Sequence, residues 1–181
     1  RRNPHHRGGK YLLKAIERFL IRRADATITV NESIALELAR RYDIPIPTVL
    51  MNTPSASIRR DFDIGRLRTA LNIPQHQNVL LYCGSFTFNR GLEKLIQSLV
   101  YLPDCHLVMM GYGAPDYKSK LLGIAHQCEA AGRFSFFGPV PSDEVPSYAA
   151  GADLGVAPIE NVCLSYYYCS PNKMFEYIAA G

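Results

Sequence analysis

From about residue 61 onwards, short apolar runs alternate with segments in which apolar residues recur at helical spacing. Short apolar runs bounded by turn residues are typical of buried strands, and the longer periodic segments are typical of amphipathic helices. The predicted strands are 79–83, 105–110, 133–137 and 152–157, and the predicted helices are 64–71, 92–101, 116–131, 143–149 and one that starts at Pro171. Strands that alternate with helices predict an α/β fold with a parallel sheet covered on both faces.

The first 52 residues follow a different pattern. Apolar residues recur at helical spacing between residues 10 and 22, with Lys and Arg between them, which predicts a basic amphipathic helix. Such a helix either packs over a core or lies on a membrane surface, and packing over a core is the more usual arrangement. Next come a predicted strand at 26–30, a helix capped by Asn31 that ends before Pro45, and a short strand at 48–51.

A stretch without periodicity, rich in Ser, Pro, Thr and Ala, separates the two patterns. We therefore divide the chain into a first part at 1–52, a linker at 53–60 and a second domain at 61–181. Ligands of parallel α/β sheets bind beyond the carboxyl ends of the strands, where the strand order reverses. The segments 84–91, 111–113 and 170–171 each come after a predicted strand, so we expect these three loops to converge there.

The last predicted helix has the features of an anion site. Ser170 is a preferred N-cap residue, and Pro171 suits the first helical position. The amino end of a helix attracts negative charge, and Lys173 and Glu176 lie one turn apart near it. A cation for phosphate beside a carboxylate for hydroxyl groups suits a nucleotide sugar. The alternative is a structural helix with Met174, Phe175 and Ile178 buried.

Composition narrows the possibilities only slightly. The chain has 181 residues, is 48% hydrophobic and 20% charged, and carries a formal net charge of +4, which is ordinary for a globular protein. We expect no nucleic-acid partner, and phosphorylated ligands or an anionic membrane surface are compatible with this charge. Five cysteines without a Cys-x-x-Cys pair argue against a disulfide framework and favour a cytoplasmic protein with free thiols.

Several segments resemble one family. The sequence Ser-Pro-Asn-Lys at 170–173, followed by Glu-Tyr at 176–177 and by Gly181, resembles the donor-site helix of family-4 glycosyltransferases, which are retaining enzymes of the GT-B fold. Segments 82–85 with 90–92, 110–113 and 137–140 resemble three further motifs of that family, in the expected order. The resemblance spans about 23–181. It implies a Rossmann-like donor-binding domain that is truncated at its carboxyl end, after the final part of an amino-terminal acceptor domain.

The resemblance also implies a role for each motif. The donor diphosphate would meet Gly84, Ser85, Arg90 and Lys173, the base would meet Gly111 and the backbone of Val140, the ribose would meet Glu176, and the transferred sugar would face a loop with Tyr167, Tyr168 and Ser170. Two positions depart from the family pattern, because Ser85 replaces an arginine and Tyr168 replaces a glutamate. The alternatives are a tight turn with a solvated arginine at 84–91 and, for the tyrosines, a cover over an incomplete domain.

One metal-binding pattern competes with this interpretation. Asp61 and Asp63 match the Asp-x-Asp signature of the other large glycosyltransferase class, which binds a metal ion. They lie beside the linker rather than after a nucleotide-binding sheet, and a helix N-cap explains Asp63 better. No His or Cys group has metal-ligand spacing. We therefore expect no metal and no cofactor.

The sequence thus predicts an enzyme that moves a sugar from a nucleotide diphosphate to an acceptor hydroxyl with retention of configuration. The acceptor would be a glycan, a lipid or a small molecule, and peripheral contact with the cytoplasmic membrane face is compatible with the basic helix. An epimerase of the same fold and a non-catalytic nucleotide-sugar-binding module are the alternatives. The 181 residues alone are expected to be inactive, since a cleft between two domains needs both, and no catalytic residue is assigned within them.

Overall fold

The computed structural model describes residues 6–53 and 62–181, and the contacts of the chain divide it into two units. The first unit runs up to Asn52 and also contains Tyr168–Ser170, and the second contains Thr53–Tyr167 and Pro171–Gly181. Most of the predicted linker, at 54–60, lies outside the described residues. That the first unit belongs to an acceptor domain stays a prediction.

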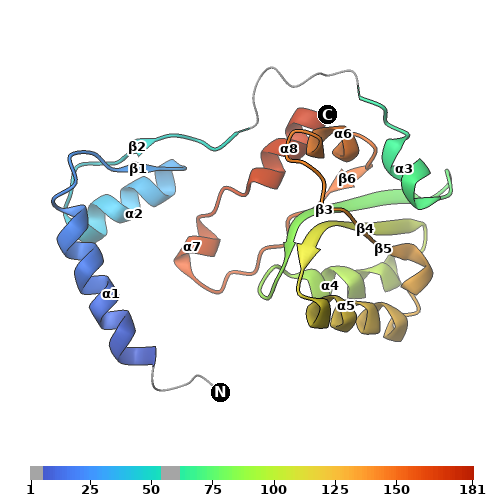
Figure 1. The fold of residues 1–181 in the computed structure, drawn as a ribbon, viewed down its shortest axis with the longest axis horizontal. Coiled ribbons are helices and arrows are strands. Elements are labelled where there is room, and N and C mark those ends of the chain that lie inside the picture. Colours follow the sequence, from blue (N-terminus) through green and yellow to red (C-terminus); the bar gives the residue numbers. More distant parts are fainter. Residues whose placement is uncertain (1–5, 54–61) are drawn as a thin grey trace. The chain divides into compact units, whose positions relative to one another are not determined.

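The described residues of the first unit form two helices and one pair of short strands (Figure 1). Its elements are α1 (His6–Ile21), β1 (Ile28–Thr29), α2 (Glu32–Tyr42) and β2 (Thr48–Val49). The strands β1 and β2 pair in parallel, with Ile28 opposite Thr48. The side chain of Asn31 accepts a hydrogen bond from the Ile34 amide at 2.9 Å, which confirms it as the N-cap of α2.

The apolar stripe of α1 does not pack over a core in the structure. Its large side chains are exposed, namely those of Tyr11, Leu12, Leu13, Ile16, Phe19 and Leu20. The prediction that this stripe covers a core is therefore not met by the described residues. The physical reason is that the first unit has only two strands of two residues each, and so small a sheet offers little surface on which a helix can bury its apolar face.

The second unit is a parallel sheet with the strand order β5-β4-β3-β6. Its elements in chain order are α3 (Arg66–Leu71), β3 (Asn78–Phe86), α4 (Leu92–Gln97), a 3₁₀ turn (Ser98–Tyr101), β4 (Cys105–Gly113), α5 (Pro115–Gln127), a second 3₁₀ turn (Ala131–Arg133), β5 (Phe134–Phe137), α6 (Val145–Ala149), β6 (Leu154–Gly155), α7 (Leu164–Tyr167) and α8 (Asn172–Ala180). This confirms the predicted α/β class. The one long predicted helix at 92–101 instead ends as a 3₁₀ turn.

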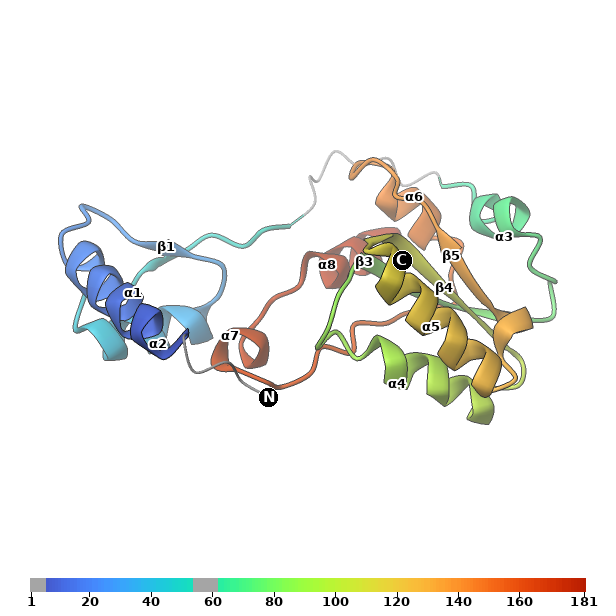
Figure 2. The ribbon, with the colours of Figure 1, turned by 60° about the horizontal axis from the view of Figure 1, so that its bottom comes forward.

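Helices cover both faces of this sheet, as Figures 1 and 2 show. The helices α4 and α5 pack on one face through buried residues such as Leu92, Ile96 and Leu121. On the other face α3, α6 and α8 pack against Val79, Leu81 and neighbouring residues. Each fully buried aliphatic side chain stabilises the fold by about 1.5–3 kcal/mol. Because each face of the sheet carries such a core, the central strands are held in place from both sides.

The central strands are longer than predicted. β3 and β4 pair in register from Asn78 opposite Cys105 to Phe86 opposite Gly113, so that Gly84 lies opposite Gly111. The prediction that Gly84, Ser85 and Gly111 lie in loops after the strands is therefore wrong. Glycine is usually a turn signal, but here Gly111 lets the two backbones approach within the sheet, and Gly84 leaves room for the Lys173 side chain.

The order of the strands places a crevice at the carboxyl edge of the sheet. The chain enters the sheet at β3, continues to β4 on one side and later returns to β6 on the other. The pairing of β6 with β3 covers only two residue pairs, Leu80 with Leu154 and Leu81 with Gly155. Beyond that point the strands diverge, which is where parallel α/β sheets bind ligands.

The start of α3 differs from the prediction that Asp63 is its N-cap. The helix begins at Arg66, and the side chain of Asp63 instead accepts a hydrogen bond from the Gly65 amide at 2.9 Å. This is the local turn that aspartate forms readily two residues ahead. Asp61, the other half of the Asp-x-Asp pattern, lies outside the described residues.

Candidate functional site

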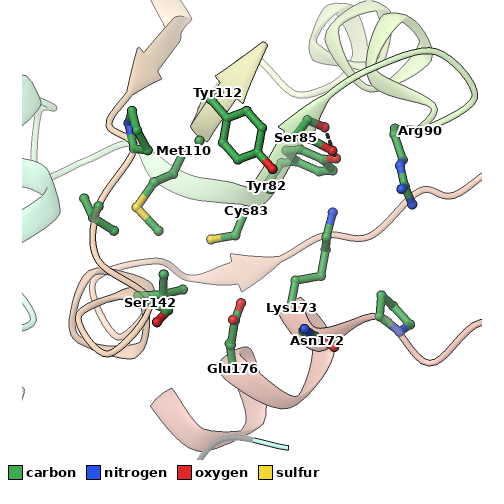
Figure 3. Close-up of a pocket in the computed structure, with 16 residues that line it drawn as sticks. Tyr82, Cys83, Ser85, Arg90, Met110, Tyr112, Ser142, Asn172, Lys173 and Glu176 are labelled. Atoms are coloured by element: carbon green, nitrogen blue, oxygen red, sulfur yellow. Dashed lines mark hydrogen bonds between the residues drawn. The ribbon is translucent and has the colours of Figure 1, made fainter. Parts of the chain in front are cut away.

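A pocket of about 400 Å³ lies at the carboxyl edge of the sheet, entirely within the second unit. Figure 3 shows the side chains that line it, which come from β3, β4, the segment after β5, and the start of α8. All residues predicted to bind phosphate, base and ribose line this pocket, namely Gly84, Ser85, Arg90, Gly111, Val140, Lys173 and Glu176. Predicted residues up to 92 positions apart in the sequence, from Gly84 to Glu176, thus meet at one site.

The residues predicted to face the transferred sugar do not line this pocket. Tyr167 is exposed at the end of α7, and Tyr168 and Ser170 belong to the first unit. Their role stays a prediction. Other lining residues lie in the segments that carry the family resemblance but were given no role, namely Tyr82, Cys83, Met110, Tyr112, Pro139 and Asn172, and two were missed, namely Ser142 and Val145. All of them lie close in the sequence to a predicted glycine, valine or lysine, and this closeness is the signal that could have identified them.

Two glycines open the floor of the pocket. A Cβ atom on Gly111 would lie 2.0 Å from the carbonyl oxygen of Gly84, and Gly111 has a φ of 145°. Gly84 has a φ of 132°, and a Cβ atom there would lie 3.2 Å from Nζ of Lys173. Both backbone conformations favour glycine. The floor is therefore bare backbone over which a ligand can approach closely.

Lys173 is buried at the amino end of α8. Its exposed fraction is 9%, and its Nζ lies 3.7 Å from the centre of the Tyr82 ring. The predicted structural alternative for this helix is wrong, because Met174 and Ile178 are 42% and 70% exposed. A helix that turns a lysine inward and apolar residues outward holds a cation in a pocket, an arrangement that suits an anionic ligand.

The start of α8 also differs from the prediction that Ser170 caps it. Pro171 has an extended backbone, with φ −72° and ψ 133°, and is the N-cap, so the first helical residue is Asn172. The hydroxyl oxygen of Ser170 instead accepts a hydrogen bond from the side-chain amide of Asn31 at 2.8 Å. The amino end of α8 still lies at the pocket, since Pro171, Asn172 and Lys173 all line it. The positive end of the helix dipole therefore favours negative charge there.

Arg90 reaches the pocket from the opposite side, from the turn before α4 (Figure 3). Its guanidinium lies 5.0 Å from the centre of the Tyr166 ring, within the range of cation–π attraction. Among the described residues, no group accepts a hydrogen bond from its buried Nε. A buried donor without an acceptor is costly in a folded protein, and an anionic ligand would remove that cost.

Glu176 lies one turn after Lys173 and lines the same pocket. Burial raises the pKa of its carboxyl group, and the nearby charge of Lys173 opposes this shift. A half-buried carboxylate accepts hydrogen bonds strongly, so it can hold the hydroxyl groups of a sugar. The remaining wall, beside Val140, is lined by Met110, Pro139 and Val145, which gives a flat ligand an apolar surface.

Tyr177 fastens α8 to the sheet where β3 and β6 diverge. Its hydroxyl oxygen accepts a hydrogen bond from the Cys83 amide at 2.9 Å and lies 3.0 Å and 3.2 Å from the carbonyl oxygens of Leu81 and Val156. A Cβ atom on Gly155 would lie only 2.3 Å from atoms of the Tyr177 ring, so the glycine leaves room for this ring. Burial raises the pKa of Tyr177, so its hydroxyl stays a donor. This contact sets the position of Lys173 and Glu176.

The Tyr177→Phe substitution is expected to lower the free energy of unfolding by about 1–3 kcal/mol, because the Cys83 amide would lose its acceptor in a buried site. Urea unfolding of the full-length protein measures this loss. Tyr101 is 84% exposed, so Tyr101→Phe is the control and should change stability by less than about 0.5 kcal/mol. Equal stability of the two variants would show that Tyr177 does not fasten α8.

Comparisons with known proteins agree with this geometry. Residues 63–165, more than half of the chain, match the family described as glycosyl transferases group 1. The chain belongs to the group 1 glycosyl transferases. Its curated relatives include a D-inositol 3-phosphate glycosyltransferase of Xylanimonas cellulosilytica, 26% identical, and a 2-deoxystreptamine glucosyltransferase of Streptomyces kanamyceticus, 24% identical. The matches cover 80% and 81% of this chain but 37% and 40% of those proteins.

Solved structures of the same class share the fold. HepE of Anabaena, in complex with UDP and glucose, superposes with a TM-score of 0.73 at 19% identity, over 98% of this chain and 48% of HepE. Sucrose-phosphate synthase of Thermosynechococcus elongatus gives a TM-score of 0.64 at 20% identity, over 83% of this chain and 39% of the synthase. These likenesses confirm a Rossmann-like domain of the GT-B fold. The chain spans less than half the length of each of these four proteins.

Two further properties concern the described residues only. None of their helices has the length and apolar character needed to cross a membrane. Within 6–53 and 62–181, no three His, Cys, Asp or Glu side chains form a group that could hold a metal ion. Cytoplasmic location and contact with a membrane face stay predictions for this group 1 glycosyl transferase.

Proposed function

We propose that the full-length protein transfers a sugar from a nucleoside diphosphate sugar to an acceptor hydroxyl group with retention of configuration. In this proposal the second unit binds the donor. The observation that carries it is a pair of cations, the buried Lys173 and the half-buried Arg90, which enter one pocket from different elements over a floor of bare backbone. A diphosphate has the charge and the size that such a site accommodates.

The reaction needs stabilisation of a leaving group. The bond between the anomeric carbon and the β-phosphate oxygen breaks, a bond from the acceptor oxygen to that carbon forms, and the proton of the acceptor hydroxyl leaves with the nucleoside diphosphate or passes to water. Negative charge then grows on the departing diphosphate, where fixed cations and a helix amino end stabilise the transition state more than the ground state. In this proposal Lys173, Arg90 and the start of α8 supply this charge, and their position around one pocket supports the assignment.

The remaining pocket residues fit the nucleoside part of the donor. Glu176 is proposed to accept hydrogen bonds from the ribose hydroxyls, and the backbone of Val140 to contact the base. HepE is described with UDP and glucose, which supports uridine as the first base and a hexose as the first sugar to test. The acceptor is proposed to be a glycan, a lipid or a small molecule.

A binding screen followed by a transfer assay tests this function. The full-length protein is titrated with UDP, GDP and ADP and then incubated with the matching hexose donors and candidate acceptors. Release of nucleoside diphosphate together with a product of unchanged anomeric configuration supports a retaining transferase. Conversion of the donor to another sugar without transfer would indicate an epimerase, and binding without turnover would indicate a non-catalytic module.

Donor binding is expected not to depend on a metal ion, since Lys173 and Arg90 supply positive charge directly. The dissociation constant for UDP should change less than about 3-fold, which is roughly 0.7 kcal/mol, when EDTA is added to the full-length protein. Titration calorimetry with and without magnesium measures this. Loss of binding in EDTA and recovery with magnesium or manganese would instead favour a metal site at Asp61 and Asp63.

A further inference from the structure

We propose that Tyr82 is a positioning residue of the phosphate site, whose buried ring carries the ammonium group of Lys173 while its hydroxyl fixes the backbone at Ser85. This proposal rests on the proposed function, because both roles of Tyr82 depend on a pocket that binds diphosphate. Tyr82 lies in β3, is fully buried and lines the pocket.

The first contact is between a cation and an aromatic face. Nζ of Lys173 lies 3.7 Å from the centre of the Tyr82 ring, well inside the distance of about 6 Å at which the ring attracts a cation. A buried ammonium group has lost much of its hydration, and this attraction grows when water is excluded. Lys173 also lines the pocket, where a bound phosphate would meet its ammonium group.

The second contact concerns the strand end that forms the pocket floor. The Tyr82 hydroxyl donates a hydrogen bond to the carbonyl oxygen of Ser85 at 2.9 Å, drawn as a dashed line in Figure 3. Burial raises the pKa of Tyr82 to about 12, so the hydroxyl keeps its proton at neutral pH and remains a donor. The bond spans Gly84, whose missing side chain leaves room for Nζ of Lys173.

These contacts give Tyr82 two separable roles, one for its ring and one for its hydroxyl group. The ring aims and stabilises the charge that meets the phosphate, and the hydroxyl holds the backbone over which the phosphate lies. Phe86, in the same strand, is equally buried and lies 6.3 Å from the Tyr82 ring, but it does not line the pocket. Phe86 is therefore a matched control for the loss of an aromatic ring from this core.

The test compares Tyr82→Leu, Tyr82→Phe and Phe86→Leu in the full-length protein, with UDP, pyrophosphate and uridine as probes in titration calorimetry. Tyr82→Leu should weaken UDP and pyrophosphate binding about 3- to 30-fold, the range of a partly desolvated cation–π contact. Tyr82→Phe keeps the ring and should lose less than about 3-fold. Uridine lacks phosphate, so its affinity should not change in any variant.

A double-mutant cycle separates positioning from general damage to the core. If the ring of Tyr82 acts through Lys173, Tyr82→Leu in a Lys173→Met background should lower UDP affinity only by the amount that the hydroxyl contributes, less than about 3-fold as in Tyr82→Phe. An equal loss in both backgrounds, or the same loss in Phe86→Leu as in Tyr82→Leu, would overturn the positioning role. If the wild-type protein bound neither UDP nor pyrophosphate, the phosphate site itself would be wrong, and the proposed function would fail with it.

Discussion

Replacing Gly111 with alanine is expected to destabilise the second unit by about 2–6 kcal/mol, because the substitution combines a strained backbone with a steric collision. The backbone of Gly111 has a φ of 145°, which residues with a side chain rarely adopt. The new Cβ atom would lie 2.0 Å from the carbonyl oxygen of Gly84. Since that oxygen belongs to a paired strand in the centre of the sheet, it cannot move aside cheaply.

Gly123 provides a control with the opposite expected sign. It lies inside α5, and a Cβ atom there would meet nothing within 4 Å. Alanine is more favourable than glycine inside a helix by about 1 kcal/mol, so Gly123→Ala should stabilise the protein slightly. Urea unfolding of both variants measures the difference. If Gly111→Ala unfolded at the wild-type urea concentration, the close pairing of Gly84 with Gly111 would be wrong.

The alternation of apolar runs and periodic segments predicted the second unit well. Strands that are buried on both faces are continuous apolar runs, and this signal is local in the sequence. The same is true of the Asn31 cap, which needs only a side chain and an amide three residues later. The pocket followed from the strand order, because carboxyl ends of parallel strands meet at one edge.

Local signals failed where a distant partner decides the structure. Ser170 is a good cap residue, but the side chain of Asn31 donates a hydrogen bond to its hydroxyl from 139 positions away. The helix α8 turns Lys173, Tyr177 and Ala180 towards the sheet, whereas its sequence pattern favoured Met174 and Ile178. The hydrogen bonds of the Tyr177 hydroxyl fix this rotation, and they depend on where β6 leaves β3.

The carboxyl ends of β3 and β4 could not be predicted from the sequence for a related reason. Gly84 and Gly111 each carry the usual signal of a turn, yet together they form one close pair in the sheet. A single glycine says only that a backbone needs space. Which neighbour occupies that space depends on the register of two strands, and that register is set by the packed cores on both faces.

Substitutions of Lys173, Arg90 and Glu176 in the full-length protein should impair donor binding and turnover to different extents. Lys173→Met and Arg90→Ala should each weaken UDP binding about 10- to 100-fold, since a charge-assisted hydrogen bond contributes about 1.5–3 kcal/mol. Both should also lower kcat, because the charge on the diphosphate grows as the sugar departs. Glu176→Gln should mainly raise the KM of the donor, since the charge on ribose does not change during transfer.

Matched controls and two probes make this comparison decisive. Lys14 is exposed on α1 in the first unit, so Lys14→Met removes the same charge as Lys173→Met and should leave UDP affinity unchanged. Uridine binding should be lowered by Glu176→Gln but not by Arg90→Ala, because uridine has a ribose and no phosphate. If a folded Arg90→Ala variant bound UDP as tightly as the wild type, Arg90 would be a solvated side chain in a turn and not a ligand of the diphosphate. Lys173 would then be the remaining cation of the site, and the same measurement on Lys173→Met would decide whether the pocket binds diphosphate at all.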